Sequence, residues 1–288
     1  MPALRHPAAR LSRRQCCLVS LGALPALLPA RQSASPPGIF LEGGTIIVVA
    51  CSAERVIVAA DGKASFRMDG FQDEVCKLAT PANKVLFAAS GLVGVGEWHA
   101  ADEARTVAAR IVGDNPYLSG STLQSIAEAW ARAMVAKIRT LPASVFAGPS
   151  IEAQTSALFA GLDRADQVNL VRATVEPIAA SRGRMDARTN VIPLANPGAN
   201  TRYLAFGMPA IAQEFLEGKT PRAKAEIAQW GNYFANSADR AEDIAIRLVE
   251  LTCYFEERKD LVGGATAAIR MDGKNGVRWL RRPPTCLR

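Results

Sequence analysis

The stretch from Gly43 to Ser65 has the sequence GGTIIVVACSAERVIVAADGKAS. It contains two apolar runs rich in Ile, Val and Ala, separated by a short polar turn at residues 52–54. β-Branched and small apolar residues on both sides of a turn predict a β-hairpin. We expect this hairpin to be buried, yet Thr45 follows two glycines at its start and Asp61 stands at its end.

The first 30 residues have the composition of a targeting segment. Four arginines and no acid lie in residues 1–15, residues 16–30 are apolar, and Leu28-Pro29-Ala30 offers a small residue to a signal peptidase. These features predict a cleavable signal peptide over residues 1–30, and Ser12-Arg13-Arg14 resembles a twin-arginine signal. The sequence therefore predicts export to the periplasm or the exterior; a mis-assigned N-terminus would instead leave the protein in the cytoplasm.

Length and charge argue against a stable membrane anchor and against a nucleic-acid partner. The apolar run of about 15 residues is short for a membrane span. Without residues 1–44, the 34 basic and 27 acidic residues become 29 and 26, a net charge of +3. No run of Lys and Arg with interleaved aromatic residues remains, so phosphate binding has little support. The remaining residues suffice for one large domain.

The cysteines do not predict a metal site. Four of the six lie outside the signal, and they form no CxxC pair and no cluster with histidine. In an exported protein one or two disulfides could form among them, and their spacing does not determine the pairing. Cys76, next to Lys77, is expected to point to the opposite face of its strand.

Strands and helices alternate in groups along the chain. Apolar runs bounded by turn residues predict strands at 84–90, 156–162, 168–175, 203–207, 265–271 and 277–280. Apolar residues recurring every three or four positions predict helices at 97–112, 121–140, 209–217 and 237–258, the second with a capping box from Ser121 to Gln124. Residues 179–202 are predicted to form a long loop. This order favours an α+β fold with two antiparallel sheets stacked between helix layers.

Four polar or glycine positions stand where strands end or loops begin. Asp61, Lys77 and Gly91 follow Thr45 by 16, 32 and 46 residues. In an antiparallel hairpin the start of one strand lies beside the end of its partner, so Thr45 and Asp61 are expected to be neighbours. A threonine made N-terminal by cleavage after Gly44 would carry both a nucleophilic hydroxyl and an α-amine that can act as its base. A lysine held by a carboxylate would assist it, and a backbone N–H after a strand could bind an oxyanion.

This spacing resembles the proteasome β-subunit family of N-terminal nucleophile hydrolases. The matching segments are GGTIIVVAC, VIVAADGKAS, CKLATPANKVLFAASGLVG and, more loosely, GGATAAIRMDG. The resemblance implies a four-layer αββα sandwich, Thr45 as nucleophile, Asp61 and Lys77 as its activating pair, and Gly91 as oxyanion donor. It also implies self-cleavage at Gly44-Thr45, which makes residues 31–44 a propeptide and 45–288 the hydrolase domain.

The same resemblance implies the nature of the substrate and partners. The family's specificity pocket corresponds to Ala64, Val75, Ala79, Ala89, Val93 and Glu97. Most of these are small and apolar, which favours an apolar substrate side chain, whereas Glu97 could attract a basic one. The implied reaction is hydrolysis of a peptide or amide bond without metal or organic cofactor, and assembly into a homo-oligomer is compatible with it.

The chain also departs from the family. Met208 stands where the family usually has a serine, and Lys259 and Val262 stand where it has an acid and a serine before Gly263-Gly264. Two other functions therefore stay open: an amidase of the same fold acting on a small amide, and a catalytically silent subunit that binds or forms oligomers.

Overall fold

The structure is a computed structural model of the chain. It describes residues 45–66, 70–72, 75–82, 84–95, 98–113, 118–141, 154–179, 185–195, 198, 200–230, 237–257 and 262–287. All of these belong to the second of two compact units, Pro36–Arg288. The predicted signal peptide, the predicted propeptide and Gly44 lie outside the described residues.

The first hairpin forms the centre of one antiparallel sheet. In spatial order the strands of this sheet are β12 (Arg202–Gly207), β1 (Ile46–Ser52), β2 (Arg55–Ala60), β13 (Ala267–Asp272) and β14 (Gly276–Arg281). Ile47 is opposite Ala60 and Ser52 is opposite Arg55, so the predicted hairpin and its turn are confirmed. Both faces of β1 are covered by other side chains, which explains its continuous apolar sequence.

A second antiparallel sheet faces the first. Its strands, in spatial order, are β11 (Met185–Leu194), β10 (Val168–Ala179), β9 (Thr155–Leu162), β6 (Val85–Ser90) and β5 (Leu78–Ala82). Side chains from β1, β2 and β13 share one apolar cluster with side chains from β6, β9 and β10, so the two sheets pack face to face. Two small two-stranded sheets are also present: β3 (Ala64–Phe66) with β4 (Gly70–Gln72), and β7 (Gly94–Val95) with β8 (Trp98–His99).

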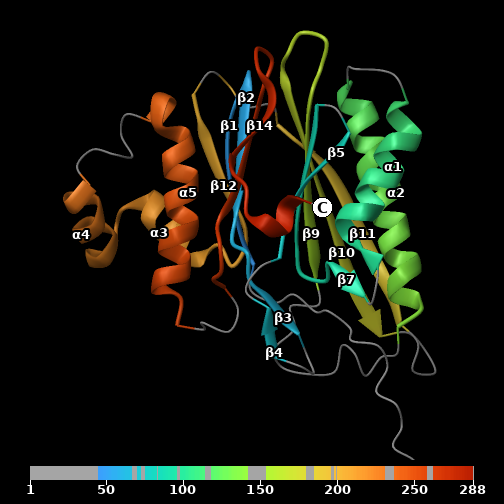
Figure 1. Cartoon of the computed structure of the whole chain (residues 1–288), viewed down its shortest axis with the longest axis horizontal. Coiled ribbons are helices and arrows are strands. Elements are labelled where there is room, and N and C mark those ends of the chain that lie inside the picture. The colour runs from blue at the N-terminus through green and yellow to red at the C-terminus, as the bar shows by residue number, and fades with distance from the viewer. Residues whose placement is uncertain are drawn as a thin grey trace, which may run out of the picture. The chain divides into compact units, whose positions relative to one another are not determined.

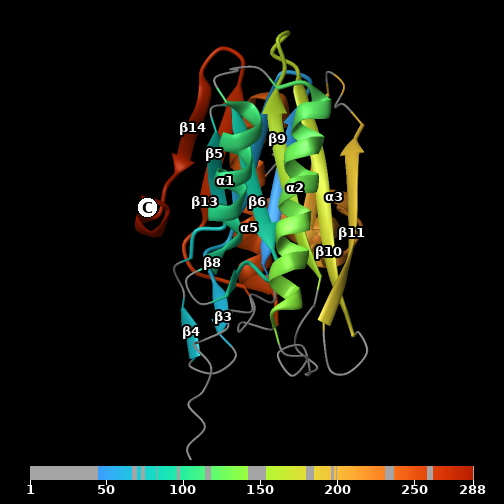
Figure 2. The same cartoon turned by 90° about the vertical axis from the view of Figure 1, so that its right-hand side faces the viewer.

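Helices cover the outer face of each sheet (Figures 1 and 2). Helices α1 (Ala100–Val112) and α2 (Gly120–Arg139) pack on the sheet that contains β6, β9 and β10. Trp130 of α2 lies there in edge-on contact with Phe87 and Phe159, at ring-centroid distances of 5.6 and 5.8 Å. Helices α3 (Ala210–Glu217) and α5 (Ser237–Phe255) pack on the sheet that contains β1 and β2, and α4 (Pro221–Trp230) lies between them in the chain. The expected mixed α+β class with two antiparallel sheets is confirmed.

Several predicted boundaries were wrong. Residues 179–202 are not one loop, because β11 pairs with β10 from Met185 to Leu194. This edge strand exposes polar residues at 188–190 and so lacks the apolar pattern of a buried strand. Helix α1 begins at Ala100, after the short strand β8, and helix α4 was not predicted. Helix α2 is capped by Ser119, whose hydroxyl accepts from the Thr122 N–H at 3.1 Å, and not by Ser121.

Across the described residues, none of the helices combines the length and the apolar character that a membrane crossing requires.

Candidate active site

Asp61 is the centre of the predicted constellation. It follows the last residue of β2 and is 1% exposed. Its Oδ1 accepts from the Ile46 N–H and from Lys77 Nζ, both at 3.0 Å. Its Oδ2 accepts from the Gly263 N–H at 3.1 Å and, at 3.4 Å, from the Lys63 N–H. The carboxylate thus joins the beginning of β1, the beginning of β5 and the turn before β13.

Lys77 and Asp61 form a buried ion pair, since neither side chain has exposed surface. Burial raises the pKa of the Asp61 carboxyl, and the charge of Lys77 and the backbone N–H donors oppose this rise. Lys77 immediately precedes Leu78 of β5, whereas Asp61 immediately follows Ala60 of β2 in the other sheet. Forming such a pair costs free energy, because both charges lose their water. Removing one partner also destabilises the fold, because the other charge is left buried alone.

Backbone hydrogen bonds fix the position of Thr45, while its side chain has no hydrogen-bond partner among the described residues. Its carbonyl oxygen accepts from the Met208 N–H at 2.9 Å, and the next N–H, of Ile46, donates to Asp61. Thr45 is fully buried, and its Oγ1 makes no hydrogen bond within the described part of the chain. Buried hydroxyls are usually paired, so an unpaired one calls for an explanation, and a catalytic role is one such explanation.

Two glycines allow close approach of the backbone at the ends of strands, and the first of them contacts Thr45. Gly207, the last residue of β12, has φ +82°, and a Cβ there would lie 1.7 Å from the Thr45 carbonyl oxygen. Gly91 follows β6 with φ +88°, and a Cβ there would lie 2.3 Å from the carbonyl oxygen of Gln154. Both positions therefore require glycine for space as well as for conformation.

The positions predicted to line a specificity pocket have different surroundings. Ala79 and Ala89 are each 2% exposed and pack in the core covered by α1, while Val93 packs at its border. Val75 is half-buried, and its N–H donates to the Gly62 carbonyl at 2.7 Å. Of the other two positions, Ala64 begins β3 and Glu97 lies outside the described residues.

Sequence reasoning missed three contributors to the site. The backbone N–H groups of Gly263 and Met208 hold Asp61 and Thr45, and Gly207 lets β12 reach Thr45. The available signals were a glycine at the end of a strand and a Gly-Gly pair before another. Of the divergent positions, Val262 is 2% exposed in an apolar cluster. Lys259 lies outside the described residues.

A disulfide joins Cys76, directly before Lys77, to Cys286 near the C-terminus. Their Cα atoms are 5.0 Å apart although 210 residues separate them in the chain. Cys51, by contrast, is a buried free thiol. Burial raises the pKa of this thiol to about 11, and the nearby Arg202 charge lowers it only in part, so Cys51 stays protonated at neutral pH.

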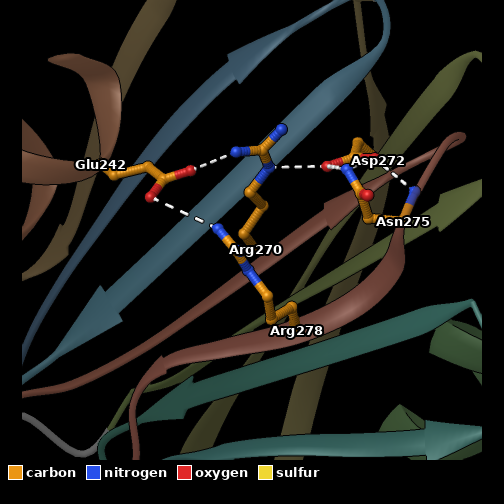
Figure 3. A network of polar contacts seen from close by, with 5 residues as sticks. All are labelled: Glu242, Arg270, Asp272, Asn275 and Arg278. Carbon is orange, nitrogen blue, oxygen red and sulfur yellow. Dashed lines mark hydrogen bonds and ion pairs between the residues drawn. The ribbon is translucent and has the colours of Figure 1, made fainter. Parts of the chain in front are cut away.

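A second polar network lies at the opposite end of β13 (Figure 3). Arg270 donates to Glu242 of α5 and, at 2.6 Å, to Asp272, and the Asn275 N–H donates to Asp272 at 2.7 Å. An adjacent cleft of about 490 Å³ is lined by three acidic and three basic side chains. The network pins the β13–β14 turn to α5, and the charges lining the cleft balance, so the cleft indicates no particular ligand.

Within the described part of the chain, no three His, Cys, Asp or Glu side chains are grouped in a way that could bind a metal ion. The sequence matches no protein-family model, and no curated protein matches it significantly. The class of protein must therefore be argued from the fold and from the geometry around Thr45.

Proposed function

We propose that this protein is a self-processed N-terminal threonine hydrolase of the proteasome β-subunit-like class, which cleaves amide bonds in peptides. One observation carries the proposal: a single buried carboxylate, Asp61, binds both the Lys77 ammonium and the N–H of the residue after Thr45. The unpaired hydroxyl of Thr45 adds support. Two facing antiparallel sheets with helices on their outer faces support the N-terminal nucleophile hydrolase fold and its αββα layers.

Maturation begins with the hydroxyl of Thr45. Its Oγ1 attacks the carbonyl carbon of Gly44, the peptide nitrogen takes up a proton as the C–N bond breaks, and an ester links Gly44 to Thr45. Water hydrolyses this ester, which releases the carboxylate of Gly44 and leaves Thr45 with a free α-amine. The Thr45–Ile46 peptide group stays in place during this step, because Met208 and Asp61 hold its two ends.

Substrate hydrolysis repeats the same chemistry in trans. The α-amine, whose ordinary pKa is about 7.7 to 8.0, accepts the Thr45 hydroxyl proton as the oxygen attacks the substrate carbonyl. The positive charge of Lys77 lowers the pKa of this amine and stabilises the developing alkoxide, and the backbone N–H of Gly91 stabilises the oxyanion. The acyl ester on Thr45 is then hydrolysed by water.

The protein acts outside the cytoplasm. A disulfide that closes a long loop is typical of proteins exposed to oxidising surroundings, and it agrees with the predicted export signal. Light scattering of the matured protein measures whether it assembles into a homo-oligomer.

A panel of fluorogenic peptides on the matured protein tests the substrate. We expect peptides with Leu, Phe or Tyr before the scissile bond to be cut faster than those with Arg or Lys. Burying a large apolar side chain contributes about 1.5 to 3 kcal/mol, whereas a solvent-screened ion pair contributes about 0 to 1 kcal/mol. The control is Thr45→Ala, which stays unprocessed and should show no turnover. Hydrolysis of small amides without cleavage of any peptide would favour the amidase, and a basic preference lost in Glu97→Gln would reverse the ranking.

A further inference from the structure

The disulfide lies beside the proposed activating lysine. Cys76 is the residue before Lys77, and Cys286 lies in the C-terminal 3₁₀ turn Pro284–Leu287, which follows β14 (red in Figure 1). β5 and β14 are edge strands of different sheets. The bond therefore ties the edge of one sheet to the C-terminal segment that leaves the edge of the other.

Within the described residues, the strand that follows Lys77, β5, is paired on one side only. Among the described strands β5 pairs with β6 alone, and its register shifts between Ala79 and Ala82. Lys77 precedes the first paired residue, Leu78, and its carbonyl accepts a long hydrogen bond from the Ala89 N–H at 3.3 Å. Short, irregular edge strands open more readily than central strands. The position of Lys77 thus depends on restraints from outside its sheet.

Three such restraints lie within three consecutive residues of the chain and cross between the sheets. The first is the hydrogen bond from the Val75 N–H to the Gly62 carbonyl at 2.7 Å. Lys77 Nζ binds Asp61, which follows β2 of the first sheet, and Cys76 is bonded to the segment after β14 of that sheet. Elsewhere the facing sheets meet largely through apolar side-chain packing, which resists sliding less specifically than a covalent bond.

We propose that Cys76 and Cys286 are positioning residues for Lys77, so that the proposed activity depends on their disulfide; this inference rests on the proposed function. Reduction by two equivalents of a small thiol yields two cysteine thiols and the oxidised reductant as its disulfide. The start of β5 then loses its covalent restraint, and the Lys77 ammonium is held against Asp61 less firmly. The proposed activity is therefore low in a reducing cytoplasm and reaches its full value after export.

The test compares matured wild type with Cys286→Ala, which breaks the bond without changing a neighbour of Lys77 in the chain. Cys51→Ala is the matched control, because Cys51 is a free cysteine buried in the same apolar cluster as Cys286. We expect kcat of Cys286→Ala to fall at least tenfold with KM within twofold of wild type, and Cys51→Ala to keep the wild-type kcat.

Two further readouts separate positioning from general damage. The acidic limb of the pH–rate profile reports the pKa of the Thr45 α-amine, because this base must be deprotonated to act. In Cys286→Ala that pKa should move upward, since a displaced Lys77 lowers the pKa of the amine less. A thiol reductant should lower kcat of wild type similarly and leave Cys286→Ala unchanged. General destabilisation would lower kcat without moving the pH profile, so an unshifted profile overturns the proposal. Equal kcat in wild type and Cys286→Ala overturns it as well.

If oxidised wild type shows no turnover that depends on Thr45, the proposed function fails, and hydrogen exchange then decides the positioning role. Faster exchange in residues 75–82 of Cys286→Ala, with β9 unchanged, supports it. Equal exchange of residues 75–82 in wild type and Cys286→Ala overturns it.

Discussion

At the scale of single residues, Asp61 is the acceptor that connects the other groups of the site. Its two oxygens accept from Lys77 and from three backbone N–H groups, and no part of its side chain is exposed. Its position next to Thr45 was predictable, because antiparallel pairing places the end of β2 beside the start of β1. The contact with Gly263 was not predictable, since this glycine approaches from 202 residues away.

The titration of Asp61 provides a direct check of its environment. Burial raises the pKa of this carboxyl, so it should take up its proton above the ordinary aspartate value of about 3.9. On acidification Lys77 then loses its counter-charge. The measurement is the ¹³C shift of the Asp61 carboxyl against pH in Thr45→Ala protein. A midpoint below the ordinary value would contradict this description of the site.

The Lys77–Asp61 pair gives a second prediction at this scale. Lys77→Met should lower the free energy of unfolding by about 3–5 kcal/mol, because it leaves a buried carboxylate without its partner. Adding Asp61→Asn should recover part of that loss, since the uncompensated charge is removed. Chemical denaturation of wild type, both single variants and the double variant measures this cycle.

Neither Lys77→Met nor Lys77→Arg should turn over substrate. Methionine carries no charge, and the guanidinium of arginine has a different geometry from the ammonium. Near-normal turnover by either of them would exclude Lys77 from the mechanism.

At the scale of elements, the end of β12 fixes the backbone of Thr45. Gly207 combines a positive φ with close contact to the Thr45 carbonyl, and Met208 donates a hydrogen bond to that same oxygen. Pairing of β12 with β1 in register, Ile46 opposite Gly207, brings these groups together. Met208 thus contributes to the site through its backbone N–H group.

Substitution of Gly207 separates steric contact from conformational strain. Gly113 also has a positive φ, of +54°, but a Cβ there would meet nothing within 4 Å. Gly113→Ala should therefore cost only the strain, about 1–3 kcal/mol, and leave processing unchanged. Gly207→Ala should cost more and slow cleavage at Gly44-Thr45, because the added methyl group displaces the Thr45 carbonyl. Denaturation and intact-mass time courses report the two effects, and equal processing rates in both variants would argue against the Gly207 contact.

The burial of an element determines how well it can be predicted from the sequence. β1 and β2 have continuous apolar sequences because both faces are covered, so their hairpin was recognisable. β11 was missed because its middle residues are exposed and polar, and its pairing with β10 comes from tertiary contact. Helix α4 was missed as well, since only Ala223 among its described side chains is fully buried.

At the scale of the whole molecule, an ion pair and a disulfide cross between the sheets near the site. The Asp61–Lys77 ion pair and the Cys76–Cys286 disulfide meet at adjacent residues of the chain, and each connects segments that adjoin strands of different sheets. Cysteine spacing could not reveal this pairing, because 210 residues separate the two partners. The fold thus places a covalent restraint where the proposed mechanism requires a fixed lysine.

The central claim is that Thr45 cuts its own chain and becomes the N-terminus. Intact-mass analysis of purified wild type, Thr45→Ala and Thr45→Ser tests it most directly. We expect wild type to begin at Thr45, Thr45→Ser to begin at the same position because it keeps a hydroxyl, and Thr45→Ala to keep the peptide bond after Gly44 intact. Trimming of Thr45→Ala to residue 45 would show that another protease makes the cut, and an uncut wild type would contradict self-processing altogether.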